Sequence, residues 1–476
     1  MRVNSPNAAK ARSHHLPNRK VASLALWGAF AAALVGCGPQ SPARSLIIIC
    51  IDTLRADHVS AYGYERDTTP VIDAFAGRAT RFDRALSTSN WTVPSVASVL
   101  TSVLPSRHGA GVPGQIKQLE ERNPPTQISP DVPMLAEVLK AQGFNTGLFS
   151  ANPFLYGSFK RSFDTAEVKR VPGEALTDAA IGWISENREK RSFLYVHFMD
   201  VHQPNLPPDP YFEYFATPDA GAREPRHSDW SYGAVKDFDD PAFLAFRANR
   251  MAAYDGSIRY VDAQIGRLLG RLEELGLLRE AVVVIYADHG EEFWDHALEQ
   301  ASQQDDPRGI WGIGHGHSMY QELLRVPLII HRGDRPAQAT VACPASLLDI
   351  APTALALLGV DAPETMQGRD LTGLLDGSGD CPRRALVAES PAYGPDSAAL
   401  VVWPMKLVRR GGVSQLFSLD TDPGERRDVA TAESRARQDM EALLDRLTTT
   451  RGRSGPAKEI DAETLQQLRA LGYLNP

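Results

Sequence analysis

The chain has 476 residues, of which 43% are hydrophobic and 23% are charged, and its formal net charge is −8. This composition is typical of globular proteins, and a chain of this length can bury a large core. The negative balance argues against a general nucleic-acid-binding function, so nucleic acid is not an expected partner.

Residues 1–36 form the first distinct segment. No acidic residue precedes Asp52, and five Lys or Arg residues come before an uncharged apolar run, VASLALWGAFAAALVG. This run is shorter than the roughly 20 residues that cross a bilayer as a helix. A basic flank followed by a short apolar run is typical of a secretory signal.

The apolar run ends at Leu34-Val-Gly-Cys37, which resembles a bacterial lipobox. This resemblance implies cleavage before Cys37, lipidation of its thiol and a membrane partner reached through the lipid anchor. Gly38 favours the outer membrane of the cell envelope, because it is not the aspartate associated with inner-membrane retention. An uncleaved anchor helix, or a plain signal with an incidental cysteine, remains an alternative.

Beyond a short linker, residues 37–44, three apolar runs predict strands that are covered on both faces. Each run leads directly into acidic or histidine side chains. The runs are Ser45–Cys50 before Asp52, Phe193–Phe198 before Asp200 and His202, and Ala281–Tyr286 before Asp288 and His289.

Helical patterns separate these strands. Residues 250–275 place apolar side chains on one face, and Gly276 fits a C-cap. Alternation of strands and helices predicts an α/β fold with a mostly parallel sheet flanked by helices. In such sheets the ligand site lies beyond the carboxyl ends of the strands, where the Asp and His side chains converge.

The remaining segments differ from this pattern. Residues 203–247 are rich in Pro, Asp, Phe and Tyr without periodicity, so we interpret them as a surface insertion near the mouth of the site. Short strand patterns and a helix then predict a small C-terminal α+β subdomain. The expected boundaries are 45–375 for the catalytic domain, 385–450 for the subdomain and 451–476 for a tail; the patterns are Ala385–Val402, Lys406–Arg409, Gln415–Leu419 and the helix 432–447.

Three cysteines follow Cys37. Cys50 lies in an apolar run and is interpreted as a small buried hydrophobe. Cys343 and Cys381 could pair in an oxidising compartment, or could remain free thiols.

Asp52, Asp288 and His289 carry the clearest chemistry. Oxygen and imidazole donors at strand ends suit a divalent cation. Each residue taken alone has a simpler interpretation, because an Asp after a strand often caps the next helix and Asp-His-Gly can form a turn.

A second candidate lies in the segment Asn90–Ser102, NWTVPSVASVLTS. Pro94 fits the first turn of a helix, which places Thr92 at or just before the helix N-terminus. Unpaired backbone amides and the helix dipole favour negative charge there. The alternative is that Thr92 is a simple N-cap.

Five segments, in order from Leu46 to about Val429, resemble the sulfatase family of the alkaline-phosphatase superfamily. In chain order, the segments start with LIIICIDTLRADHVSAYGYERDTTP, VVVIYADHGEEF, GHGHSMYQELLRVPLII, LLDIAPTALALLGV and LFSLDTDPGERRDV. The resemblance implies an alkaline-phosphatase-like fold and hydrolysis of sulfate or phosphate-type esters.

Transferred by position, the resemblance assigns roles to individual residues. Asp52, Asp288 and His289 would be metal ligands, and Thr92 would be both a ligand and the nucleophile. His202 would be an active-site histidine beside the ester group.

Either His315 or His317 would be a cationic helper for the leaving group. The implied cofactor is one divalent metal ion, with Ca²⁺ favoured by the family and Mn²⁺, Mg²⁺ or Zn²⁺ as alternatives. A second metal would need an Asp and two His, for which Asp200, His202 and His315 or His317 are candidates; one metal is preferred.

The chain also departs from the family pattern. Usual sulfatases oxidise a Cys or Ser at the position of Thr92 to formylglycine, and an Arg stands where this chain has Val96. Thr cannot form that aldehyde, and Ser95 is a weaker candidate because no Arg follows it. The family's paired Asp-Asp is Asp52-Thr53 here, so one oxygen ligand is weakened or lost.

These departures favour phosphoryl transfer. A formylglycine hydrate releases sulfate by collapsing to the aldehyde, an exit that a sulfated Thr lacks, whereas a phosphorylated Thr is a plausible intermediate. The expected substrate is a sulfated or phosphorylated small molecule, glycan or lipid. Two alternatives remain: a phospho-group transferase acting on envelope glycan or lipid, and a non-catalytic binding lipoprotein.

Overall fold

The computed structural model describes residues 43–120, 124–161, 163–217, 237–333, 339–381, 383–449, 452–456 and 460–470. The predicted signal segment, the lipidation site Cys37 and most of the linker lie outside these residues, as do residues 218–236 of the predicted insertion. None of the helices within the described ranges has the length and apolar character needed to cross a bilayer.

An eight-stranded sheet forms the centre of the fold, in the order β13-β2-β12-β8-β1-β7-β5-β6. All neighbouring strands run parallel except β12, which is antiparallel to both β8 and β2. The three predicted strands are confirmed as β1, β7 and β8. The bounds are β1 (Ser45–Ile51), β2 (Thr80–Phe82), β5 (Asn145–Ser150), β6 (Thr165–Val168), β7 (Ser192–Phe198), β8 (Ala281–Tyr286), β12 (Leu328–Arg332) and β13 (Thr340–Val341).

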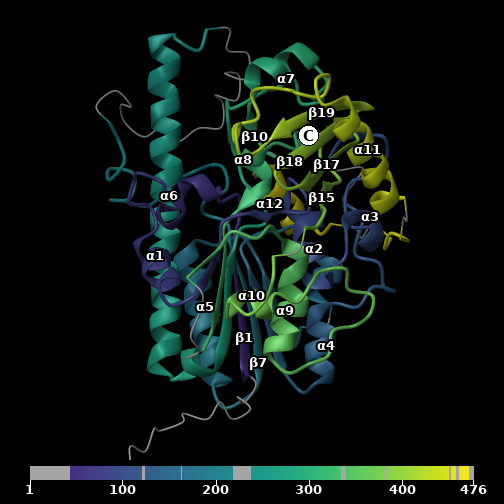
Figure 1. The fold of residues 1–476 in the computed structure, drawn as a ribbon. Coiled ribbons are helices and arrows are strands. Elements are labelled where there is room, and N and C mark those ends of the chain that lie inside the picture. Colours follow the sequence, from purple (N-terminus) through teal and green to yellow (C-terminus); the bar gives the residue numbers. More distant parts are fainter. Residues whose placement is uncertain are drawn as a thin grey trace, which may run out of the picture. The chain divides into compact units, whose positions relative to one another are not determined.

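Helices cover both faces of this sheet, as Figure 1 shows. Buried apolar runs such as Leu46–Ile51 require cover on both faces, and they make the core continuous across the sheet. The predicted fold class is therefore confirmed. One face carries α1 (Pro70–Ala76), α5 (Gly173–Glu186) and α6 (Pro241–Glu274), and the other carries α2 (Thr92–Thr101), α4 (Leu135–Ala141) and α9 (Ile350–Leu357).

Helix α6 starts nine residues before its predicted start at 250, so part of the expected irregular insertion is helical. The side chain of Asp240 accepts a hydrogen bond from the backbone of Ala242, and Pro241 occupies the first turn. These two residues are typical of loops in the sequence, but together they make a helix start. The predicted end holds, because Gly276 adopts a left-handed conformation just past the helix.

The C-terminal subdomain matches its predicted α+β composition. Its antiparallel sheet, in the order β15-β17-β18-β19, packs against α11 (Ser434–Thr448). The region predicted as a tail contains a further helix, α12 (Ala462–Ala470), whose Leu468 is buried in the main core. The strands are β15 (Leu386–Glu389), β17 (Ser397–Val402), β18 (Met405–Arg410) and β19 (Val413–Ser418).

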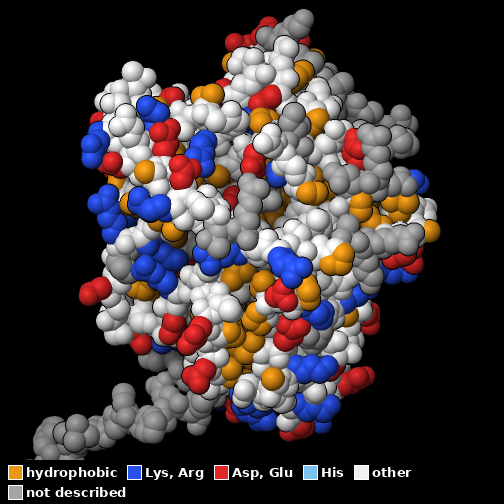
Figure 2. Space-filling model, turned by 90° about the vertical axis from the view of Figure 1, so that its right-hand side faces the viewer, with side chains coloured by type: hydrophobic (Ala, Val, Ile, Leu, Met, Phe, Trp, Pro, Cys, Tyr) orange, Lys and Arg blue, Asp and Glu red, His pale blue; other side chains and the backbone are white. Residues whose placement is uncertain are grey.

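Short elements complete the described chain. They are α3 (Pro105–His108), α7 (Ala297–Gln303), α8 (Gln321–Leu324), α10 (Thr372–Leu375), β3 (Ala85–Leu86), β4 (Ile116–Lys117), β9 (Glu292–Phe293), β10 (Ile313–Gly314), β11 (Arg325–Val326), β14 (Ala345–Ser346) and β16 (Gly394–Pro395). Basic and acidic side chains are interspersed over the face drawn in Figure 2, so the charge of its described part is mixed.

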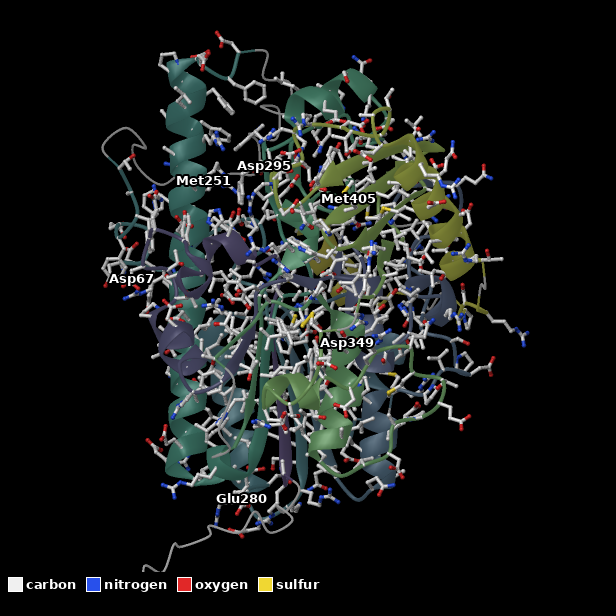
Figure 3. The ribbon with its side chains drawn as sticks, viewed as in Figure 1. Asp67, Met251, Glu280, Asp295, Asp349 and Met405 are labelled. Atoms are coloured by element: carbon white, nitrogen blue, oxygen red, sulfur yellow. A yellow bond between two sulfur atoms is a disulfide. The ribbon has the colours of Figure 1, made fainter. Side chains whose placement is uncertain are left out.

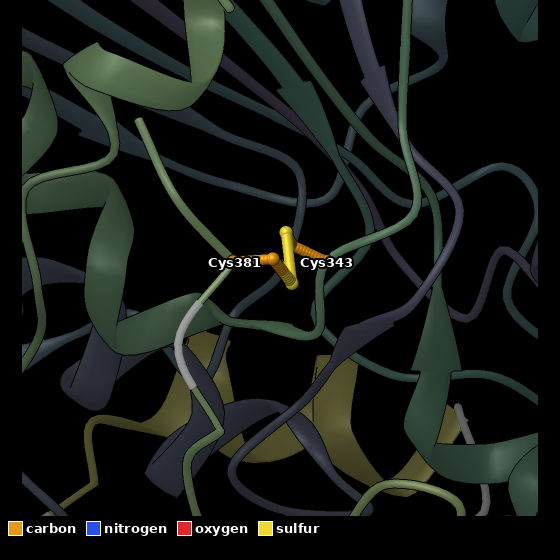
Figure 4. Close-up of a disulfide and its surroundings, with 2 residues drawn as sticks. All are labelled: Cys343 and Cys381. Carbon is orange, nitrogen blue, oxygen red and sulfur yellow. A yellow bond between two sulfur atoms is a disulfide. The ribbon is translucent and has the colours of Figure 1, made fainter. Parts of the chain in front are cut away.

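Cys343 and Cys381 form a disulfide across 38 residues, with their Cα atoms 5.5 Å apart (Figure 4). Cys50 is buried and free. The closed loop carries α9, which packs against α2. The disulfide therefore closes a loop whose helix packs against α2.

We expect the double variant Cys343→Ser, Cys381→Ser to lose about 4 kcal/mol of unfolding free energy, because the unfolded chain regains the entropy of an open loop of this length. Urea unfolding of parent and variant measures the difference. A reductant should bring the parent to the stability of the variant and leave the variant unchanged. A parent whose unfolding midpoint is insensitive to the reductant contradicts this expectation.

Candidate active site

The candidate site lies at the carboxyl-end edge of the central sheet. Glu280, just before β8, and Asp295, beyond its end, lie at opposite ends of the sheet in Figure 3. Asp52 follows β1, and Asp288 and His289 follow β8, and all three side chains are fully buried. Parallel pairing of β1 with β8 brings the two strand ends together, as the sequence predicted.

Asp52, Asp288 and His289 form a compact group whose potential ligand atoms all lie within 4.8 Å of one another. The His289 Nε2 atom is 3.7 Å from Asp52 Oδ1 and 3.5 Å from Asp288 Oδ2. Both of these carboxylate oxygens are buried and lack a hydrogen-bond partner. His289 Nδ1 lies 2.8 Å from the carbonyl oxygen of Gly290, which can only accept, so Nδ1 carries the proton and Nε2 keeps its lone pair.

The electrostatics of this group favour a bound cation. Burial raises the pKa of Asp288 well above its usual range, and the charge of Asp52 raises it further. Burial opposes ionisation of Asp52 as well, but the hydrogen bond and charge of His197 outweigh it and lower the pKa of Asp52. Two adjacent buried carboxylates with unpaired oxygens, facing an imidazole lone pair, fit one divalent metal ion.

Thr92 is the first residue of α2, and its hydroxyl faces the candidate metal ligand His289. Its Oγ lies 3.3 Å from His289 Nε2 and 3.2 Å from the side-chain nitrogen of Asn152. Trp91, and not Thr92, occupies the N-cap position of α2, and no side chain forms a capping hydrogen bond there. The simple N-cap interpretation of Thr92 is therefore wrong.

Ser95, the weaker nucleophile candidate, points elsewhere. Its hydroxyl donates to the backbone carbonyl of Asp288 over 2.7 Å and lies 3.0 Å from the hydroxyl of Ser87. Val96, at the position of the family's Arg, is fully buried in the core. Thr53 donates its backbone N–H to Asp288, while its hydroxyl is buried without a hydrogen-bond partner.

Two residues that the sequence did not single out hold Asp52 in place. Asn152, two residues beyond the end of β5, donates to Asp52 Oδ2 over 2.6 Å. His197, within β7, contacts the same oxygen through Nε2 at 2.9 Å. Both bonds engage one carboxylate oxygen and leave the other directed at the candidate metal position. Asn152 lies just after a strand of the sheet, as the predicted ligands do. His197 lies within an apolar run, so its sequence position did not indicate a role in the site.

The structure separates the two histidines whose roles were left open. His315 packs with its ring centroid 4.4 Å from that of His289 and 5.0 Å from that of His202. His317 instead contacts Glu292 Oε2 through Nε2 at 2.8 Å. Of the two, His315 is the one placed among the candidate active-site side chains.

His202 and His315 lie beside the candidate metal-ligand group, and their burial disfavours the charged imidazolium form. Burial lowers the pKa of His202 to about 3 and that of His315 well below its usual range. Glu291 contacts His315 Nδ1 at 3.1 Å, and burial raises the pKa of Glu291 to about 7. A cationic role for His315 therefore requires the added negative charge of a bound ester.

The C-terminal subdomain positions this histidine segment. Gly316 has φ +83, its N–H donates to the carbonyl of Asn90, and its own carbonyl accepts from Ala392 and Tyr393. A Cβ at this glycine would lie 2.9 Å from the Cβ of Ala392. The close approach and the positive φ both require glycine at this position, so the backbone next to His315 is held between Asn90 and the C-terminal subdomain.

Other candidate ligands are placed differently. Asp200, considered for a second metal, accepts the N–H of Gly173 through Oδ1, while its Oδ2 is buried without a hydrogen-bond partner. None of the ligand groups among the described residues includes Asp200. Burial raises the pKa of the Cys50 thiol, so it keeps its proton and is a poor ligand. Despite burial, the pKa of His296 is raised to about 9 by its bond to Glu322. Cys50 and His296 belong to the two other candidate ligand groups among the described residues. The first group is Cys50 with His197 and Asp288, and the second is His296 with Glu292 and Glu322.

Comparisons with known proteins identify related sequences and structures. Residues 44–360 match the family model described as Sulfatase. The chain is 26% identical to arylsulfatase A of Bos taurus, over 76% of this chain and 73% of the relative. It is 24% identical to an arylsulfatase of Clostridium perfringens, over 82% of this chain and 90% of the relative.

Solved structures share the fold. A structure described in complex with its substrate D-glucosamine-2-N,6-O-disulfate aligns with a TM-score of 0.68 at 18% identity, covering 86% of this chain and 98% of the other. The phosphonate monoester hydrolase of Agrobacterium radiobacter aligns with a TM-score of 0.65 at 18% identity, over 86% of this chain and 95% of the other.

Proposed function

Because this chain belongs to the sulfatase family of ester hydrolases, we propose that it uses Thr92 as the nucleophile and acts on phosphorus esters rather than sulfate esters. The single observation that carries this proposal is the Thr92 hydroxyl, set at the start of α2 against Asp52, Asp288 and His289. A divalent ion held by these residues would supply the Lewis acidity that activates a threonine hydroxyl.

The identity of the nucleophile favours phosphorus. A threonine ester of sulfate has no aldehyde to collapse to, so its release requires attack by water at sulfur. In a phosphothreonine or phosphonothreonine intermediate, water attacks phosphorus. This attack releases the phosphate or phosphonate and regenerates the hydroxyl of Thr92. The substrate first loses its alcohol as Thr92 Oγ bonds to phosphorus, and water then breaks that bond.

Charge narrows the substrate class further. The charges of one divalent ion and of the carboxylates of Asp52 and Asp288 cancel. Arg55, three residues beyond Asp52, is paired with Asp57 and Asp295. Such a site favours a singly charged phosphate diester or phosphonate monoester over a doubly charged phosphate monoester. The fold shared with a named phosphonate monoester hydrolase is compatible with this choice.

A set of substrates with one common leaving group tests the proposal. We expect kcat/KM for methyl p-nitrophenyl phosphate or p-nitrophenyl phenylphosphonate to exceed that for p-nitrophenyl sulfate and for p-nitrophenyl phosphate by at least about tenfold. All four substrates release the same phenol, so the differences report the transferred group. An enzyme that prefers p-nitrophenyl sulfate contradicts the choice of phosphorus.

The metal also follows from the donor set. The family resemblance favours Ca²⁺, which takes six to eight oxygen ligands. The chain offers two carboxylates, one hydroxyl and one imidazole nitrogen at this point. We propose that Mn²⁺ or Zn²⁺ is preferred, because imidazole is a good ligand for such ions. Retention of Ca²⁺ in competition with equal Mn²⁺ and Zn²⁺ would overturn this preference.

We also propose that the protein is anchored in the bacterial envelope through Cys37, on the basis of the lipobox resemblance. The disulfide between Cys343 and Cys381 suits an oxidising compartment. Cys37→Ser should release the protein from the membrane fraction or leave its precursor unprocessed. An unchanged membrane-bound product of mature size contradicts the anchor.

A further inference from the structure

Asn152 is a fully buried amide that contacts both the candidate nucleophile and a candidate metal ligand. Its orientation is fixed by its own oxygen, which accepts the backbone N–H of Phe154 over 2.9 Å. Because a backbone N–H can only donate, the NH₂ end of the amide must face Asp52 and Thr92. Its two N–H groups match these two acceptors.

The hydrogen bond between Asn152 and Thr92 has one direction, because Asn152 donates and the Oγ of Thr92 accepts. The Nε2 atom of His289, 3.3 Å from the same Oγ, is the candidate metal ligand. The bond from Asn152 does not use the hydroxyl proton of Thr92, so it remains when that proton is lost. A hydrogen bond to an oxygen strengthens as that oxygen gains negative charge.

Among the described residues, neither side chain that contacts the Oγ of Thr92 is a lysine or an arginine. In the part of the chain that the structure describes, the side-chain partners of Thr92 Oγ are Asn152 and His289, and the family's Arg position is the buried Val96. We infer that Asn152 positions the hydroxyl of Thr92 and stabilises the negative charge that develops on Oγ during attack. This inference rests on the proposed function of Thr92.

The test compares Asn152→Ala with Asn145→Ala, which removes an asparagine at the opposite end of the same strand. Asn145 donates to Asn187, at the amino end of β5 and away from the site edge. We expect kcat of Asn152→Ala to fall about 10²- to 10³-fold, as for the loss of one oxyanion donor, with KM changed only a few fold. Metal content should stay at the parent level, because His197 still holds Asp52. Asn145→Ala should keep the parent kcat.

Asn152→Asp provides an isosteric second variant. Its carboxyl group can still accept the N–H of Phe154, so the local turn is retained, but it carries at most one proton and cannot donate to both Asp52 and Thr92. We expect it to be at least as inactive as Asn152→Ala. The inference is overturned if either variant keeps kcat within about fivefold of Asn145→Ala, or if loss of metal accounts for the loss of activity. A parent that turns over no phosphorus ester overturns the proposed function instead.

Discussion

Thr92→Ala is expected to lose turnover of its best substrate by a factor on the order of 10⁴ or more, the scale at which other enzymes lose a nucleophile. The substitution removes the hydroxyl that lies 3.3 Å from His289 Nε2 and leaves the buried start of α2 otherwise intact. Steady-state kinetics on the phosphonate substrate measure the loss.

Two substitutions at the same position serve as controls. Thr92→Ser keeps a hydroxyl and should retain partial activity. Thr92→Cys should not become a formylglycine in a host that carries the converting enzyme, because Val96 replaces the Arg of the usual recognition segment. Near-parent activity of Thr92→Ala would show that Thr92 does not attack. Ser95 would be a poor substitute, since its hydroxyl is committed to the carbonyl of Asp288.

Asp288→Asn is expected to weaken metal binding more than about 100-fold, beyond the loss usual for a residue that only supports a ligand. The amide oxygen of Asn can still accept the N–H groups of Thr53 and His289 that now reach Asp288 Oδ1. Its NH₂ group, however, replaces the unpaired Oδ2 that faces His289. Elemental analysis and a metal titration of the purified variant measure the effect.

Asp200→Asn is the matched control for this prediction. Asp200 also follows a strand of the same sheet, but it belongs to no ligand group among the described residues. Its removal should leave one metal ion per chain. If Asp288→Asn retains the parent metal content, the ligand set is wrong. If Asp200→Asn loses metal, a second site exists.

Strand ends are where the sequence predicted most of the candidate site. Asp52 and Asp288 each follow an apolar run that is unmistakably a buried strand, and parallel pairing brings them together. Asn152 obeys the same rule but was missed, because the preceding strand, NTGLFS, contains a glycine and polar residues and forms no continuous apolar run. Its strand character depends on pairing with both β6 and β7, which a sequence pattern does not contain.

Long-range contacts account for the other omissions. His197 lies in an apolar run whose two faces are both typical of a protein core, so the sequence did not predict its contact with Asp52. Spacing alone could not separate His315 from His317. Gly316, between them, forms backbone hydrogen bonds with Asn90 and with the C-terminal subdomain. The two side chains then contact different partners, Glu291 for His315 and Glu292 for His317.

The most direct test of Thr92 as the nucleophile is mass spectrometry of the parent enzyme, used in excess over the phosphonate substrate and quenched in acid at intervals during a single turnover. We predict a phosphonyl adduct on the peptide that contains Thr92. The adduct should appear with release of p-nitrophenol, decay as turnover completes, and be absent from Thr92→Ala. Release of p-nitrophenol without an adduct on that peptide at any interval, or with an adduct on another residue, contradicts the assignment of Thr92 as the nucleophile.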